Sequence, residues 1–517
     1  MTKSSAAVMT HPSTKTVGRR RPRVLVVTPE IAELPPVMGD YARGVAAKGS
    51  GLADMTAALI SSLLHQGADV HVALPHYRGM FAPPGDGLGP WSRTRMTKVP
   101  GSRLHLAEDR LFYYQAGIDS HAVNGDLRPA LFFQREVINH IVPWVQPDLI
   151  HCHDWMTGLI PPMARRMGIP CLFTLHNPVS HHATLAEIEE TGIDAAEFWQ
   201  YLYYEWWPGD YETTRSTNPA DFLTSAVIAA DYVNTTSQAF LAEILHGADD
   251  VVPHNLQREM IRKADEGKVC GIPAAPGRSM RPSRDPSLTQ RYSAPRHRLG
   301  KYVNKAALRR RLGLPHKGET PLIFCPSRGA LRRGSDGLLN DVIPLAISRF
   351  GDRGLQIVAA DTRLRPGDDG FTQTTADGAS VFIGQFDEEL LHLGYAASDF
   401  TLIASPSERY ATAEAVSMIY GSLPLTPASG EPSDTLVQLD VHADRGNAFP
   451  FRHARVGDVA GAIERAMQFH QEPESLRAAQ VARVMKESAS AHRSSNMARR
   501  YSRLYEKLLG GPIATHE

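Results

Sequence analysis

The chain has 517 residues, more than one hydrophobic core usually serves, so two domains of ordinary size are expected. Its 55 basic and 55 acidic residues balance, which excludes the positive charge typical of proteins that bind nucleic acid or anionic membranes. No run of about 18 apolar residues and no signal-peptide core is visible, so a soluble, cytoplasmic protein is expected. Four widely spaced cysteines fit reduced thiols in that compartment.

The N-terminal part predicts a tail followed by a βα unit. Residues 1–22 are polar and unpatterned, which predicts a disordered tail, and Val24–Val27 form the apolar run of a buried parallel strand. A glycine-rich loop at Lys48, Gly49 and Gly51 then opens a helix with one apolar face. Such a loop allows a ligand to approach the backbone closely, although glycine before a helix is also ordinary turn chemistry.

Two predicted strands end in a histidine and a polar partner. The first reaches His153 and Asp154, and the second reaches His176 and Asn177. The carboxyl ends of parallel strands form the ligand-binding edge of an open α/β sheet, so these side chains are expected to share one rim. A metal site is the alternative, but the histidines lack the close pairing at helical spacing that zinc sites show, and we expect no metal.

Two further stretches are ambiguous. The tract 197–207 holds seven aromatic residues, which could stack on sugar rings or pack as ordinary core. The stretch 259–304 becomes rich in proline, glycine and arginine and has no period. It predicts a linker or a surface excursion between two domains.

A second series of strands and helices follows, in which one strand-to-helix loop carries a basic pair. A strand at 321–325 and a helix from Leu338 enclose Arg328 and Arg333. A loop at the carboxyl end of a parallel strand, with free N–H groups at the helix start, favours an anion such as a phosphate. The alternative is a solvated basic loop.

The sequence thus predicts an α/β protein with two doubly wound domains that face a central cleft. The first domain is expected at 23–258 and the second at 305–490. The helix 491–510 has an apolar face and is expected to pack back on the first domain.

Several motifs, in this order and spacing, resemble the bacterial glycogen and plant starch synthases from about residue 23 to 510. They are Lys48-Gly-Ser-Gly-Leu52, Asp148-Leu-Ile-His-Cys-His-Asp-Trp155, Phe173-Thr-Leu-His-Asn177, Ser327-Arg328 with Arg333-Gly334, and Ser405-Pro-Ser-Glu408 with Tyr420-Gly421. The resemblance implies the GT-B fold and a retaining transfer of glucose from ADP-glucose to the non-reducing end of an α-1,4-glucan, in glycogen synthesis. It implies no cofactor, and as partners a nucleotide sugar and a glucan; the oligomeric state is left open.

The resemblance also implies site residues in both domains. Arg328 and Arg333 would hold the diphosphate, and the Lys48 loop would meet it from the other domain. Glu408 would lie beside the donor sugar and ribose. His176 would lie near the donor's C6 hydroxyl and the reacting carbon, and Asp154 near the sugar and the acceptor. The remaining donor-binding positions are Gly430, Asp434 and Thr435.

The chain departs from the family pattern at several of these motifs. Arg333 stands where the family has lysine, which keeps the charge but changes its geometry. The glycine and proline usual after Glu408 are absent, and Glu431 puts a carboxylate near the expected phosphate. Two classes of function therefore stay open: an active glucosyltransferase, with ADP-glucose or another donor, and a glucan-binding or regulatory relative with weakened catalysis.

Overall fold

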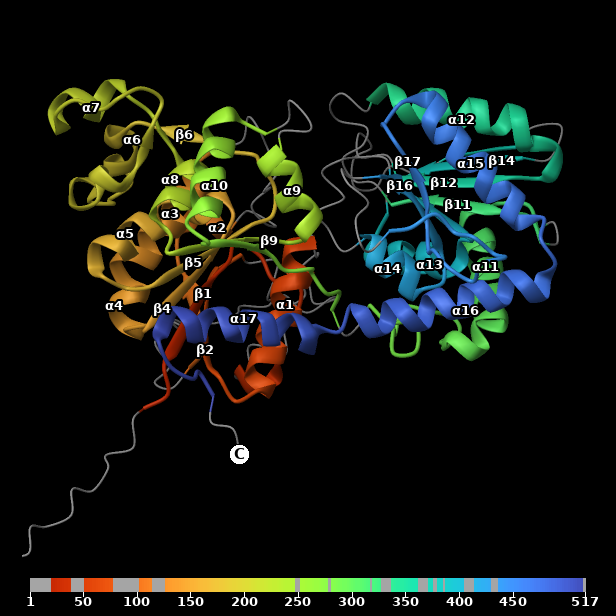
Figure 1. Cartoon of the computed structure of the whole chain (residues 1–517), viewed down its shortest axis with the longest axis horizontal. Helices are drawn as coiled ribbons and strands as arrows, with labels where there is room; N and C mark the ends of the chain where they lie inside the picture. Colours follow the sequence, from red (N-terminus) through yellow and green to blue (C-terminus); the bar gives the residue numbers. More distant parts are fainter. Residues whose placement is uncertain are drawn as a thin grey trace, which may run out of the picture.

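The protein is described by a computed structural model with two α/β domains (Figure 1). The described residues are 20–38, 51–77, 102–113, 126–246, 252–277, 280–316, 319–326, 336–360, 371–374, 379–384, 386–403, 413–428 and 436–514. Within these residues, every helix is too short or too polar to cross a membrane.

The first domain is built on a parallel sheet of seven strands in the order β10-β9-β5-β4-β1-β2-β3. The strands are β1 (Arg23–Val27), β2 (Asp69–Pro75), β3 (Leu104–Ala107), β4 (Leu149–His153), β5 (Cys171–Leu175), β9 (Tyr232–Thr235) and β10 (Val269–Gly271). The central strands β4 and β5 are buried throughout, as their apolar runs predict.

Helices cover both faces of this sheet (Figure 1). They are α1 (Gly51–His65), α2 (Arg110–Tyr113), α3 (Arg128–Glu136), α4 (Val142–Val145), α5 (Ile160–Met167), α6 (Leu185–Glu190), α7 (Tyr211–Thr217), α8 (Phe222–Ala229), α9 (Gln238–His246) and α10 (His254–Asp265). A small antiparallel sheet of β6 (His182–Ala183), β8 (Ala220–Asp221) and β7 (Tyr203–Tyr204) lies in the part of the domain that carries α6 and α7.

The second domain repeats the design with a sheet in the order β13-β14-β12-β11-β15-β16-β17, in which only β13 runs antiparallel. Its strands are β11 (Leu322–Cys325), β12 (Gln356–Ala360), β13 (Phe371–Thr374), β14 (Ser380–Gly384), β15 (Phe400–Leu402), β16 (Leu423–Pro427) and β17 (Phe449–Phe451). Its helices are α11 (His297–Leu312), α12 (Asp336–Phe350), α13 (Glu388–Ala397), α14 (Ala413–Ile419), α15 (Val456–His470) and α16 (Glu474–Ala491). Two doubly wound domains are therefore confirmed.

The boundaries between the domains differ in detail from the predicted ones. The stretch 259–304, predicted as a linker, contains the end of α10, the whole of β10, which pairs with β9, and the start of α11. Strand β10 has three residues and is only half buried, so its sequence carries little signal. In the predicted tail, residues 1–19 lie outside the described residues, while Arg20 bonds to Asp148 and Arg21 to the carbonyl of Gly67.

The last helix, α17 (Ser494–Leu509), returns from the second domain to the first and packs beside α1 (Figure 1). Its apolar side chains Met497, Tyr501 and Tyr505 are buried in the core of the first domain. The chain therefore crosses between the domains twice. Arg281, in the first crossing, donates to the carbonyl of Ala489 at the end of α16 and to that of His492 in the second crossing, which ties the two crossings together.

Candidate functional site

The described part of the site is centred on Asp154, the residue that follows β4. Its φ of 59° places it in a region that residues other than glycine rarely adopt. Its side chain is 1% exposed, and its two carboxylate oxygens accept hydrogen bonds from the main-chain N–H of His176, at 2.7 Å, and from Nδ2 of Asn177, at 2.8 Å. Backbone strain of this kind persists where the surroundings hold it and is common at functional sites.

Burial makes this carboxyl group unusual. It raises the pKa of Asp154 to about 8, in spite of the two hydrogen bonds that lower it, and the nearby charge of Glu30 raises it further. A carboxyl group that is protonated near neutral pH can donate a hydrogen bond to a sugar hydroxyl as well as accept one. Such perturbed groups are more frequent at functional sites than elsewhere.

Two histidines stand next to Asp154 at the ends of β4 and β5. Nδ1 of His153 and Nε2 of His176 are 3.0 Å apart and share one proton. Burial, and then the neighbouring histidines His151 and His176, lower the pKa of His153 well below its usual range, so its ring is neutral. In the described part of the chain, Nε2 of His153 is buried and has no hydrogen-bond partner. The shared proton therefore fixes the orientation of the His176 ring.

A chain of buried hydrogen bonds lies beneath this rim. Nε2 of His151 bonds to Oγ1 of Thr174 at 2.7 Å, and Thr174 donates to Oδ1 of Asn234 at 2.7 Å. Because Thr174 uses its only proton on Asn234, it accepts from His151, whose Nδ1 then accepts from the Tyr505 hydroxyl at 2.7 Å. At the other end of this series of hydrogen bonds, Asn234 donates to the hydroxyl of Tyr501 at 2.8 Å.

This chain of hydrogen bonds joins strands β4, β5 and β9 of the first domain to α17, the helix that returns from the second domain. Burial lowers the pKa of His151 to about 3, so His151 is neutral at physiological pH. Its ring lies 4.2 Å from that of His153, measured between centroids, and so connects the helix to the rim. The sequence could have indicated His151, since it points to the same side of β4 as His153, two residues on. Its tyrosine partner lies 354 residues away and carried no such signal.

The structure brings together the first-domain residues that the sequence placed on one rim: His153, Asp154, His176 and Asn177. Gly51 is the first residue of α1, as predicted. The other candidate positions lie outside the described residues. They are Lys48, Gly49, Arg328, Arg333, Glu408, Gly430, Asp434 and Thr435. Among the residues that the structure does describe, no cluster of three or more metal-ligating side chains is found.

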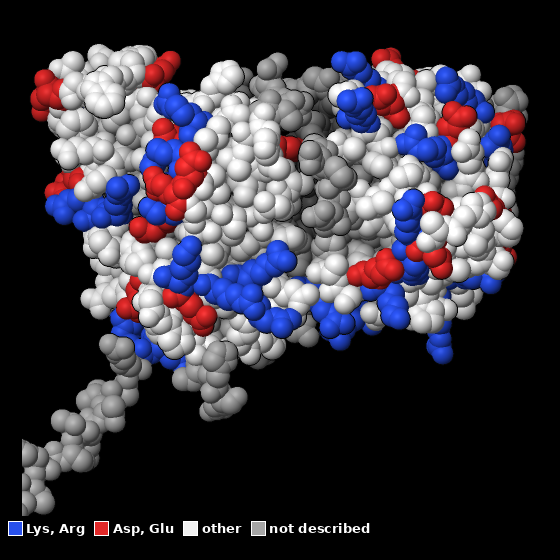
Figure 2. Space-filling view, in the orientation of Figure 1, with Lys and Arg blue, Asp and Glu red and all other residues white. Residues whose placement is uncertain are grey.

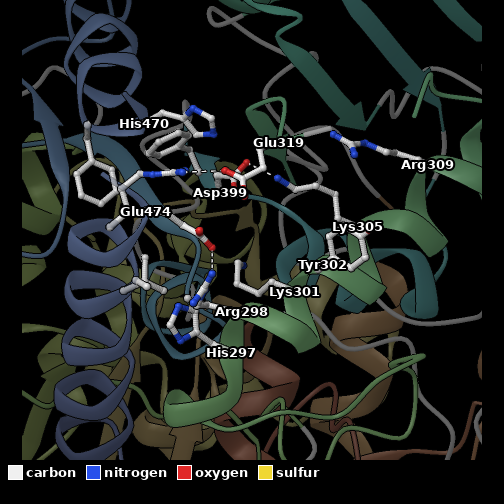
Figure 3. Close-up of a pocket in the computed structure, with 16 residues that line it drawn as sticks. His297, Arg298, Lys301, Tyr302, Lys305, Arg309, Glu319, Asp399, His470 and Glu474 are labelled. Atoms are coloured by element: carbon white, nitrogen blue, oxygen red, sulfur yellow. Dashed lines mark hydrogen bonds and ion pairs between the residues drawn. The ribbon is translucent and has the colours of Figure 1, made fainter. Parts of the chain in front are cut away.

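A cavity of about 160 Å³ in the second domain is a separate feature (Figure 3). It lies where Glu319 and Asp399 precede β11 and β15, at the amino ends of these strands, opposite the expected ligand-binding edge. Figure 3 shows Lys305 directed toward Asp399, at 2.5 Å, and Arg298 paired with Glu474.

Glu319 of this cavity is likewise paired, with Arg477 at 2.9 Å. Burial alone would raise the pKa of Asp399, but Lys305 and other cations hold it at about 2. Because each carboxylate of the cavity faces a cation, we assign these charges to the stability of the second domain and not to the candidate site.

Comparison with known proteins finds similarity to starch and glycogen synthases. Residues 23–258 match the sequence model of the starch synthase catalytic domain. Glycogen synthase 2 of Geobacter sulfurreducens is 29% identical over 522 residues, covering 93% of this chain and 98% of that protein. Glycogen synthase of Geobacillus stearothermophilus is 25% identical over 510 residues, covering 90% of this chain and 95% of that protein.

Solved structures show the same fold. The catalytic domain of starch synthase IV from Arabidopsis thaliana, bound to ADP and acarbose, is similar with a TM-score of 0.69 and 22% identity, over 95% of this chain and 99% of that chain. Sucrose-phosphate synthase from Thermosynechococcus elongatus has a TM-score of 0.52 and 17% identity, over 95% of this chain and 100% of that chain. The predicted GT-B arrangement is confirmed.

Proposed function

We propose that this chain, which is similar to glycogen synthases over nearly its whole length, is a glycosyltransferase of the glycogen and starch synthase family. It extends an α-1,4-glucan with glucose from ADP-glucose, with retention, in glycogen synthesis. The observation that carries the proposal is the cluster of Asp154, His176 and Asn177 at the carboxyl edge of the first sheet, in a chain similar to glycogen synthases over nearly its whole length. The cytoplasm is the compartment we propose.

The described residues suit the binding of a sugar. Asp154 is held by two donors and buried, so it offers a fixed polar group at a water-poor position. His176 is oriented by His153 on one side and by its main-chain bond to Asp154 on the other. Groups fixed in this way need little reorganisation when the substrate arrives, which is how positioning lowers a reaction barrier.

The leaving group requires cations. When the bond between the sugar and the diphosphate breaks, the electron pair stays on the phosphate oxygen, where negative charge grows. Arg328 and Arg333 are the groups that we propose to stabilise this charge, together with the Lys48 loop, and Glu408 is proposed to contact the donor sugar. The carboxylate of Glu431 and the changes around Glu408 support the alternative of a glucan-binding relative with weak catalysis.

The test is nucleotide release from ADP-glucose or UDP-glucose in the presence of glycogen. The Arg328→Ala variant should lose about 3 kcal/mol of transition-state stabilisation, or roughly a hundredfold in kcat at saturating donor, with a smaller loss in donor affinity. Arg298→Ala is the matched control, since Arg298 pairs with Glu474 at the opposite edge of the same domain.

Three results would decide between the alternatives. Normal turnover in the Arg328→Ala protein would refute the role of this loop. Absence of nucleotide release from every donor, with glycogen binding retained, would favour the regulatory relative. A product that carries the new glucose in β linkage, detected by proton NMR, would refute retention.

A further inference from the structure

The aromatic tract 197–207 divides into two parts in the structure. Most of its rings are covered. Phe198 and Tyr204 are buried in the core, and Trp199 packs edge-on against Tyr211 with ring centroids 5.7 Å apart. The guanidinium of Arg165 covers the ring of Tyr201, at 5.4 Å.

One more ring of the tract, that of Tyr203, is covered by a cation. Arg258 lies over it, 5.8 Å from the ring centroid, and also donates to its hydroxyl at 2.8 Å. Packing or a cation therefore accounts for each aromatic side chain of the tract as far as residue 204.

The two tryptophans at the end of the tract are different. Trp206 is 53% exposed and Trp207 is 93% exposed. Large apolar side chains that remain this exposed at one spot commonly mark a binding surface. We call Trp206 and Trp207 the tryptophan pair.

The backbone that carries the tryptophan pair is fixed. Asn218, itself 2% exposed, donates from Nδ2 to the carbonyl of Trp206 at 2.7 Å and accepts from the N–H of Trp206 at 3.3 Å. The N–H of Glu205 donates to the carbonyl of Pro219 at 3.1 Å. The pair is thus presented by an ordered turn, so little conformational freedom would be lost when a ligand stacks on it.

The charges around the tryptophan pair select the kind of ligand. Residues 205–212 contain three carboxylates, those of Glu205, Asp210 and Glu212, and no cation. Figure 2 shows the corner of the first domain over α6 and α7 as a mainly uncharged surface, with acidic groups at its outer edges and basic groups beside acidic ones where it meets the rest of the domain. This charge disfavours phosphates, nucleic acid and anionic membranes. It suits a neutral polyol, whose hydroxyls donate to carboxylates while its flat apolar faces cover aromatic rings.

We propose that the tryptophan pair is a second, non-catalytic binding site for an α-glucan chain. The inference rests on the proposed function, in which the acceptor is a polymer with many chain ends. The pair belongs to the turn between β7 and α7, and α7 lies with α6 on the side of the first domain away from the second domain (Figure 1). A branched glucan bound there would raise the local concentration of chain ends at the cleft, whereas a short oligosaccharide could not reach both sites.

The direct test is native electrophoresis through gels that contain glycogen, without any nucleotide sugar. Glycogen should retard the wild-type protein, and Trp207→Ala should raise the apparent dissociation constant about tenfold. Since Trp207 is almost fully exposed, this substitution removes little packing. Trp144→Ala is the matched control, because Trp144 is 54% exposed on α4 and lies outside the tract; it should behave as wild type.

Turnover supplies the second readout. In Trp207→Ala, KM for glycogen should rise about tenfold while kcat, and KM for maltotriose, stay at wild-type values. Retardation equal to that of the wild type, or no retardation of the wild type at all, would overturn the proposal. A change in native mass on gel filtration after Trp207→Ala would also overturn it, since the pair would then cover a second copy of the chain.

The two proposals fail in different ways. If the wild-type protein releases no nucleotide but its glycogen retardation depends on Trp207, the second site stands and the proposed reaction does not. If the wild-type protein turns over ADP-glucose and Trp207→Ala changes neither readout, the reaction stands and the second site does not.

Discussion

Replacement of Asp154 by asparagine should change how stability depends on pH. Asp154 titrates near 3.8 in the unfolded chain, whereas burial raises its pKa in the folded chain to about 8. Between these values the folded protein holds one proton more than the unfolded chain. The stability that this proton contributes is fully present below the unfolded pKa and is lost as the pH rises toward 8.

The size of the effect follows from the pKa shift. One pKa unit corresponds to about 1.4 kcal/mol and the group is half titrated at pH 8, so the wild-type protein should lose about 2 kcal/mol between about pH 6 and about pH 8 from this group alone. The Asp154→Asn variant would have no proton to lose at this position. It would, however, keep only one of the two hydrogen bonds, because its new amide nitrogen would face the donor Nδ2 of Asn177. That loss costs about 1–3 kcal/mol at both pH values.

The measurement is urea unfolding of wild-type and Asp154→Asn protein at the two pH values, followed by circular dichroism. The variant should be the less stable protein at the lower pH, and the difference should shift in its favour by about 2 kcal/mol at the higher pH. Asp231→Asn is the control: Asp231 is an exposed aspartate that accepts one main-chain N–H, from Cys171, and its variant should follow the wild type. An unchanged difference between wild type and Asp154→Asn at the two pH values would refute the raised pKa.

Three further predictions concern the support of the site. Tyr505→Phe should cost about 1–3 kcal/mol in urea unfolding, because Nδ1 of His151 loses its donor; stability equal to the wild type would contradict the chain of hydrogen bonds. Truncation after residue 490 removes α17 from the core of the first domain, so both the cooperative unfolding of that domain and turnover should be lost. Unchanged melting and activity would refute the role of α17 in that core. In Gly158→Ala the new Cβ would meet the carbonyl oxygen of Phe222 at 2.4 Å. The midpoint of thermal unfolding should therefore fall by several degrees, corresponding to about 1–3 kcal/mol. A midpoint equal to that of the wild type would show that the backbone moves to relieve the clash.

The sequence predicted the features that depend on local pattern. The central strands are continuous apolar runs because both faces of a parallel sheet are covered, and their polar ends mark the functional edge by a rule of topology alone. This is why Asp154 and His176 could be expected on one rim before their 2.7 Å contact was known. Short strands escaped prediction: β3 has four residues and β10 has three, too few to establish a period.

The rest depends on contacts between distant parts of the chain. The positive φ at Asp154 is held by its bonds to the residues that follow β5, and aspartate by itself does not specify it. The chain of hydrogen bonds under the rim joins His151 to Tyr505 across 354 positions, and only the return of α17 brings them together. The aromatic tract was ambiguous because burial, which separates Phe198 from Trp207, depends on how α7 and β8 fold around it.

The return of α17 has a consequence for biosynthesis. When Gly271, the end of β10, leaves the ribosome, the first domain still lacks Met497, Tyr501 and Tyr505, which belong to its core. The nascent first domain therefore exposes apolar surface of α1, and leaves His151 without its tyrosine, while the whole second domain is being made. Exposed apolar surface on an incomplete domain invites aggregation and chaperone binding. Completion of the N-terminal fold is thus delayed until α17 is translated, so a ribosome that stops short of α17 releases a protein whose first domain is unfinished.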